Sequence, residues 1–118
     1  LGRLCRFHLW EPNYFGIHKA LPHEEALKEH GPGIKRAFTY KALNKLIQGS
    51  AADMTKKAML ELYKAGITPH IQIHDELDIS VKDDKQAKQI VEIMESAVRL
   101  EVPNKVDYET GSNWGNIK

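Results

Sequence analysis

Cysteine is nearly absent from this sequence of 118 residues, and several common functional motifs are missing altogether. A single cysteine, Cys5, excludes an internal disulfide framework, so we expect a reducing compartment such as the cytoplasm. No apolar run approaches the ~20 residues that a membrane helix needs, and no membrane partner is expected for this stretch. Neither a glycine-rich phosphate loop nor a zinc-ligand spacing is present. The sequence therefore carries no motif that favours a P-loop or zinc-dependent function.

The net charge is only +1, but the basic residues are concentrated in one segment. Residues 35–57 hold six basic groups against the single acidic Asp53, whereas residues 58–118 hold seven basic and eleven acidic groups. A local excess of lysine and arginine on a near-neutral chain is typical of a surface that binds a polyanion. A solvated helix face gives the same pattern, and charge alone leaves both interpretations open.

The hydrophobic periodicity predicts an α+β fold in a single domain of residues 1–118. Proline and glycine make residues 12–35 a long loop or insertion, with one short helix at 23–30. The other expected elements follow in the order strand, helix, strand, strand, helix, strand: residues 2–10, 38–64, 70–74, 77–81, a helix that starts at Asp83 and is closed by Pro103, and 105–109. This βαββαβ-like order resembles a ferredoxin-like unit, an antiparallel sheet with helices on one face. Gly49 interrupts the long helical pattern and marks a kink, a helix boundary or close approach by another backbone.

The stretch IQIHDELDIS, residues 71–80, sets acidic side chains inside an apolar series. Its apolar residues alternate with the period of half-buried strands, and we expect them to anchor two strands: Ile71, Ile73, Leu77, Ile79 and Val81. The chain is expected to turn at Asp75 and Glu76, next to His74. A carboxylate at such a tip leaves the core and can meet a hard cation such as Mg²⁺. A simple polar turn explains the same residues and stays open as an alternative.

Tyr40, Asn44 and Gln48 are spaced four residues apart and share one side of the predicted long helix. Amide groups in such a row can donate hydrogen bonds to the acceptors that every base pair shows in the minor groove. The row could thus check base-pair shape without reading sequence. An exposed polar stripe without a ligand is the alternative.

Taken together, these segments resemble the C-terminal palm region of family A DNA polymerases, the DNA polymerase I type. That family carries Asn-x3-Gln-Gly-x-Ala-Ala-Asp on a helix, then an apolar strand that ends in His-Asp-Glu. The matching residues here are Asn44, Gln48, Gly49, Ala51, Ala52, Asp53, His74, Asp75 and Glu76. Two flanks agree as well, at Leu1-Gly2-Arg3 and at Gly111, Asn113 and Trp114. The resemblance covers nearly the whole chain apart from residues 12–35.

The resemblance implies roles for these residues. Asp75 would be one of two aspartates that hold a catalytic Mg²⁺ pair, Glu76 would support the metal site, and His74 would contact the primer end. Asn44 and Gln48 would touch the minor groove of template–primer DNA, and deoxynucleoside triphosphates would be the other substrate. From charge, we add phosphate contacts for three basic residues: Arg36, Lys41 and Lys45.

The sequence departs from the family pattern in several places. Tyr40 stands where many members have arginine, which leaves its groove contact in doubt, and Asp78 stands where an apolar residue is common. Residues 12–35 look longer than the usual connection. The second metal-binding aspartate and the nucleotide-gripping helix of the family are missing. We therefore expect a C-terminal piece of a longer or split polymerase, inactive without its upstream remainder.

Two other hypotheses remain open at this point. A ferredoxin-like module that binds nucleic acid without chemistry fits the element order, although residues 70–81 lack the aromatic side chains of an RNA-recognition sheet. A small metal-dependent hydrolase could use the same carboxylates, supported only by the one acidic cluster.

Overall fold

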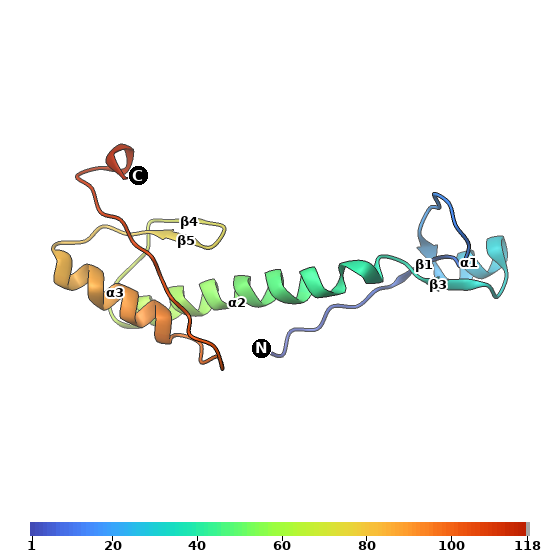
Figure 1. The fold of residues 1–118 in the computed structure, drawn as a ribbon, viewed down its shortest axis with the longest axis horizontal. Coiled ribbons are helices and arrows are strands. Elements are labelled where there is room, and N and C mark those ends of the chain that lie inside the picture. The colour runs from blue at the N-terminus through green and yellow to red at the C-terminus, as the bar shows by residue number, and fades with distance from the viewer. Residues whose placement is uncertain (118) are drawn as a thin grey trace. The chain divides into compact units, whose positions relative to one another are not determined.

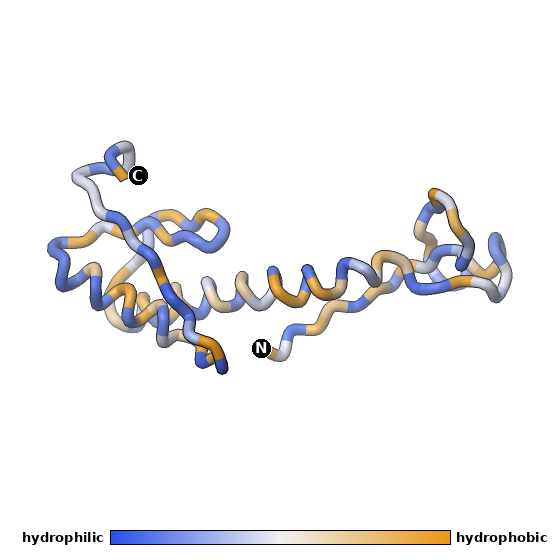
Figure 2. The backbone as a smooth tube through the Cα atoms, viewed as in Figure 1, coloured by the Kyte–Doolittle hydropathy of each residue, from blue (hydrophilic) through white to orange (hydrophobic). Residues whose placement is uncertain are grey.

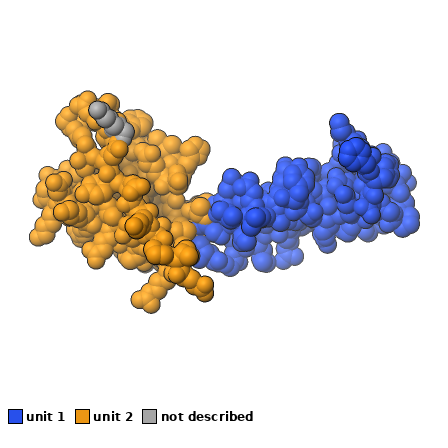
Figure 3. Space-filling model, viewed as in Figure 1, with its two compact units in different colours: residues 1–50 blue, residues 51–118 orange. Residues whose placement is uncertain are grey.

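The computed structural model describes residues 1–117, and the chain divides into two units, residues 1–50 and residues 51–118 (Figures 1 and 3). In chain order the elements are β1 (Leu9–Pro12), β2 (Leu21–Pro22), α1 (His23–His30), β3 (Ile34–Arg36), the 3₁₀ turn Thr39–Lys41, α2 (Ala42–Lys64), β4 (Ile71–Ile73), β5 (Glu76–Asp78), α3 (Asp84–Ser96) and the 3₁₀ turn Trp114–Asn116. The predicted α+β class is confirmed. The strands form two small antiparallel sheets, so the single palm-type sheet stays a prediction.

The first unit is built around a three-stranded sheet in the order β2-β1-β3. Trp10 pairs with Leu21 on one side and with Arg36 on the other. Helix α1 packs against β1, and the side chains buried in this unit are small: Pro12, Ala26 and Ala37. These small side chains remove little apolar area from water, so hydrophobic burial stabilises this unit only weakly.

Two predictions for this unit need correction. The strand expected over residues 2–10 begins only at Leu9, and no strand forms over residues 1–8. Residues 12–35 hold β2, α1 and the start of β3, so an open loop was the wrong description. The short helix at 23–30 is confirmed; glutamates lie in its first turn, and Gly31 ends it at φ 70°. Whether this segment is an insertion stays a prediction.

Helix α2 runs without interruption through Gly49. The helix boundary that the glycine suggested is therefore not observed. A Cβ atom built at Gly49 would lie 3.7 Å from Arg3 Cδ, an ordinary van der Waals distance, so a side chain fits there.

Gly49→Ala is accordingly expected to raise the free energy of unfolding by about 0.5–1 kcal/mol, since alanine loses less backbone entropy in a helix. The matched variant Gly66→Ala is expected to lower it by about 1 kcal/mol, because Gly66 lies at φ 81°, where a Cβ is strained. Urea denaturation of both variants measures the two shifts. Shifts of the same sign would contradict the continuous helix.

In the second unit, α2 ends in a Schellman motif. The Ile67 N–H donates to the Leu62 carbonyl at 2.9 Å, and the Gly66 N–H donates to the Tyr63 carbonyl at 3.0 Å. The motif brings Ile67 back onto Leu62, and with Ile90 of α3 these residues form the buried cluster. Partly buried side chains complete it: Leu77, Ile79, Ile93 and Met94.

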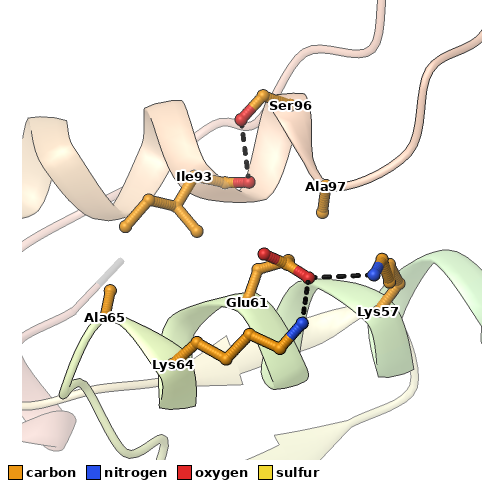
Figure 4. Close-up of a pocket in the computed structure, with 7 residues that line it drawn as sticks. All are labelled: Lys57, Glu61, Lys64, Ala65, Ile93, Ser96 and Ala97. Carbon is orange, nitrogen blue, oxygen red and sulfur yellow. Dashed lines mark hydrogen bonds and ion pairs between the residues drawn. The ribbon is translucent and has the colours of Figure 1, made fainter.

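Helix α3 lies alongside the C-terminal half of α2 (Figure 1). Its start is fixed by reciprocal capping: the Gln86 N–H donates to Asp83 Oδ1 at 2.8 Å, and the Lys82 N–H donates to Gln86 Oε1 at 2.7 Å. Figure 4 shows the groove between the two helices, where Lys57 and Lys64 both donate to Glu61. These hydrogen bonds hold the pKa of Glu61 below its ordinary value.

The strand expected at 105–109 does not form within the described residues. The Val106 N–H donates to Glu95 Oε1 at 2.9 Å, so a side chain of α3 takes the place of a neighbouring strand. None of the helices described in residues 1–117 combines the length and hydrophobicity of a membrane span.

Candidate functional site

The β4–β5 hairpin holds the acidic cluster predicted from the sequence. Its register pairs Ile73 with Glu76 and Gln72 with Leu77, so the turn consists of His74 and Asp75. The sequence prediction put the turn one residue later and made both strands longer. His74 takes φ 51°, the left-handed conformation that tight two-residue hairpin turns require and that histidine tolerates better than most residues.

The two-residue turn decides which side chains share a face. Residues directly opposite each other in an antiparallel pair point to the same side. Ile71 and Ile73 therefore share their face with Glu76 and Asp78, whereas Leu77 lies on the opposite face and packs onto the core. Of the residues expected to anchor the two strands, Leu77 and Ile79 pack against the buried cluster, whereas Ile71 stays 43% exposed.

Three carboxylates follow one another along the turn and β5 of the hairpin. Asp75 and Glu76 are exposed, and Asp78 is half-buried. Asp78 raises the pKa of Glu76, first through a hydrogen bond between the two carboxyls and then by charge repulsion; burial and the charge of Asp75 act in the same direction. The buried Oδ2 atom of Asp78 has no hydrogen-bond partner within the described part of the chain.

Asp78 was not among the predicted site residues. The sequence carried a signal, because Asp78 stands where an apolar residue is common in the family that these motifs resemble. Residues two apart in a strand point to the same face, and Glu76 joins Asp78 in β5 because the turn ends one residue earlier than predicted. The carboxylate cluster is thus larger than the sequence indicated.

The other predicted contacts lie around the start of α2, in the first unit. Tyr40 and Lys41 belong to the 3₁₀ turn, and Asn44, Lys45 and Gln48 follow in the first turns of the helix, all exposed. Asn44 and Gln48 are one helical turn apart and form the amide row that their spacing predicted. This set and the hairpin carboxylates belong to different units.

Arg36 has structural contacts in the first unit. Its Nη1 donates to the Phe7 carbonyl at 2.7 Å, and its guanidinium lies 4.9 Å from the centre of the Trp10 ring. The ammonium of Lys41 lies 4.9 Å from the Phe38 ring centre. Lys41 is nevertheless exposed. The guanidinium of Arg36 already donates to the Phe7 carbonyl, so a phosphate would have to bind its remaining N–H groups.

Comparison with known proteins identifies the family that these motifs resemble. The family model described as DNA polymerase family A matches residues 15–116. The chain belongs to DNA polymerase family A. The match extends into residues 12–35, so it reaches beyond the motifs that carried the resemblance.

Individual relatives agree with this assignment. A DNA-directed DNA polymerase of Pseudomonas phage M6 is 49% identical over 79 residues, which are 67% of this chain and 12% of that protein. DNA polymerase I of Bacillus caldotenax is 41% identical over 87 residues, 65% of this chain and 10% of that protein. The thermostable DNA polymerase I of Thermus filiformis is 38% identical over 92 residues, 72% of this chain and 11% of that protein. The chain therefore spans 10–12% of the length of these relatives. No solved structure matches it significantly.

The hairpin of this family A chain carries carboxylate oxygens, which are suitable ligands for Mg²⁺, but it carries too few of them to hold the ion alone. Ionised carboxylates are the hard donors that this cation prefers, and the unpartnered Oδ2 of Asp78 and the raised pKa of Glu76 mark a site where positive charge would be favourable. Among residues 1–117, however, no three histidine, cysteine or acidic side chains are grouped closely enough to hold a metal ion. Within residues 1–117 the hairpin carboxylates therefore form no metal site by themselves.

The raised pKa of Glu76 gives a prediction for the dependence of stability on pH. The folded state binds this proton more tightly than the unfolded chain, so its stability falls as the pH rises above the ordinary value of 4.5. Glu76→Gln is expected to remove this small loss, giving a higher urea midpoint than the parent chain at about pH 8 but not at about pH 4.

Glu61→Gln serves as the control with the opposite sign. The pKa of Glu61 is lowered by hydrogen bonds from Lys57 and Lys64, so its contribution is present above 4.5 and is lost as the pH falls. This variant is expected to lose stability at about pH 8. Equal midpoints for Glu76→Gln and the parent chain at both pH values would contradict the proximity of the carboxylates.

Proposed function

We propose that these residues form the C-terminal palm part of a DNA-directed DNA polymerase, a nucleotidyltransferase that extends a primer 3′ end on a template. The observation that carries the proposal is the two-residue hairpin tip with its cluster of carboxylates in a chain that belongs to family A. The relatives' names give the activity of much longer proteins, of which this chain spans about a tenth. Activity is therefore proposed for the complete polymerase, not for this piece alone.

In this proposal Asp75 and Glu76 would be Mg²⁺ ligands. The remaining polymerase chain would supply a further carboxylate ligand to the same site. Bound Mg²⁺ would supply Lewis-acid activation of the primer hydroxyl and charge neutralisation at the phosphates. The chain's own part is positional, since the tight turn holds Asp75 at the tip of two hydrogen-bonded strands. His74, the neighbouring turn residue, would contact the primer end.

The amide row of α2 would bind the template–primer duplex. Asn44 and Gln48 can donate to minor-groove acceptors, which occur at every base pair, so the contact tolerates any sequence. Lys45 and Lys41 are exposed beside them and would meet phosphates, and Tyr40 could stack or donate. Arg36 is retained only as a weaker phosphate contact, given its bonds to Phe7 and Trp10. We propose that both units belong to one palm region, with residues 12–35 as an insertion in it.

Reconstitution tests this function. The chain is mixed with the polymerase of Pseudomonas phage M6 lacking its matching segment, and primer extension is measured with Mg²⁺ and all four deoxynucleoside triphosphates. We expect extension by the mixture and none by either part alone. An assembled mixture that binds primer–template but never extends it would refute the polymerase assignment and favour a non-catalytic nucleic-acid-binding module. Phosphoester hydrolysis by the isolated chain would instead favour a small hydrolase.

A further inference from the structure

The first turns of α2 carry large aliphatic side chains that the described structure leaves in solvent. Leu43, Leu46 and Ile47 are 67%, 63% and 60% exposed. We call these three residues the apolar stripe. Farther along the same helix Thr55, Ala58 and Leu62 are buried, so the helix meets a core only in its second half.

The apolar stripe occupies one face of the helix. At about 100° per residue, Leu46 and Ile47 lie about 60° and about 40° to either side of Leu43, while Asn44 and Gln48 lie about 100–140° away from it. A stripe of this width is typical of a helix that packs against a protein core. Figure 2 shows the hydrophobic stretch in this part of α2.

The N-terminal arm, residues 1–8, lies beside a neighbouring face of the helix and leaves Leu43 and Ile47 open. Residues of the arm, among them Arg3 and Cys5, line a groove with Lys45, Leu46 and Gly49. Leu46 borders this groove, whereas Leu43 and Ile47 do not line it. Duplex DNA is a poor occupant, because its binding surfaces are rich in charged and polar groups rather than aliphatic ones.

We propose that the apolar stripe is the surface on which the rest of the polymerase chain packs, and that this packing turns the amide row toward the duplex. The inference rests on the proposed function. The choice of occupant rests on length: this chain makes up 12% and 10% of two relatives, so most of a family A polymerase lies outside it. With the stripe buried against that remainder, Asn44 and Gln48 stay uncovered on another face of the helix.

Cysteine labelling separates the two faces. In a Cys5→Ser background, single cysteines replace Leu43, Ile47, Asn44 or Gln48, and alkylation is followed by mass spectrometry of this chain without DNA. In the isolated chain all four cysteines should react at similar rates. After assembly with the truncated phage M6 polymerase, alkylation of the Leu43→Cys and Ile47→Cys variants should slow at least about tenfold, while the two amide-row variants change by less than about twofold.

A cysteine substitution in the stripe could itself weaken packing. The affinity of this chain for the truncated polymerase is therefore measured separately with two aspartate variants. Leu43→Asp is expected to weaken assembly at least about tenfold, because it would bury a charge, while Asn44→Asp, its neighbour on the amide face, changes it by less than about threefold. Circular dichroism should show equal helix content for both variants, since each side chain is exposed in the isolated chain.

Equal alkylation of the two faces after assembly, or equal affinity of the two aspartate variants, would overturn the proposal. Protection of the stripe in the isolated chain that grows with concentration would overturn it in favour of a second copy. Protection that requires primer–template DNA would overturn it in favour of nucleic acid. Primer extension by the unlabelled Cys5→Ser parent assembly reports on the proposed function separately: a protected stripe without extension by that parent supports the surface and refutes the polymerase.

Discussion

Asparagine in place of Asp75 is expected to reduce primer extension by the assembled polymerase about 10³-fold or more, with little change in folding. The carboxylate is the group proposed to hold Mg²⁺, and a neutral amide binds this cation far more weakly. Losing several kcal/mol of charge stabilisation in the transition state corresponds to a rate loss of about this size. The side chain is exposed, and asparagine is a common turn residue, so the hairpin itself should persist.

The measurement is the single-turnover rate of primer extension at saturating Mg²⁺, with circular dichroism as the check on folding. Asp107→Asn provides the matched control, because it removes the same charge at an exposed position outside the hairpin. The control should extend primers at the parental rate. Parental activity in the Asp75→Asn variant would eliminate the hairpin as the metal-binding element, even if the chain still assembled.

Leu62→Ala is expected to lower the free energy of unfolding by about 2–5 kcal/mol, the largest stability loss that we predict. Leu62 is 0% exposed and contacts Ile67 and Ile90 in the buried cluster of the second unit. It also lies in the last turn of α2, where its carbonyl accepts the Ile67 N–H. Truncation therefore leaves a cavity beneath the motif that ends the helix.

Leu60→Ala is the matched control, since Leu60 lies on the same helix but is 46% exposed. Its expected loss is below about 1 kcal/mol. Urea denaturation followed by circular dichroism compares the two variants, with the slope of the transition reported for each. Similar losses for both would mean that the cluster around Leu62 does not hold this unit together.

The helices could be predicted because their apolar spacing is local information. Ala58 and Leu62 of α2, and Ala87 and Ile90 of α3, fall in this three- and four-residue spacing and are buried. The same spacing continues through the start of α2, where the apolar side chains are exposed. Periodicity shows which face of a helix is apolar, but it does not show what covers that face.

The strands were less predictable because pairing depends on distant residues. Residues 2–8 alternate as well as a strand does, yet the described structure gives them no neighbouring strand. Val106 bonds to the side chain of Glu95, which no strand pattern reveals. The roles of the candidate site residues, including Asp75, Asn44 and Gln48, stay predictions that the proposed experiments test.

The turn of the β4–β5 hairpin has a consequence for which sequence changes this segment tolerates. Two residues, His74 and Asp75, connect the strands, and that number decides that Glu76 and Asp78, rather than Leu77, share a face with Ile71 and Ile73. One added or deleted turn residue would exchange the sides, sending carboxylates into the core and Leu77 into solvent. Point substitutions in the turn leave that arrangement intact. The hairpin should therefore accept changes of residue type far more readily than changes of length, and length variants should be strongly depleted in a selection for folded chains.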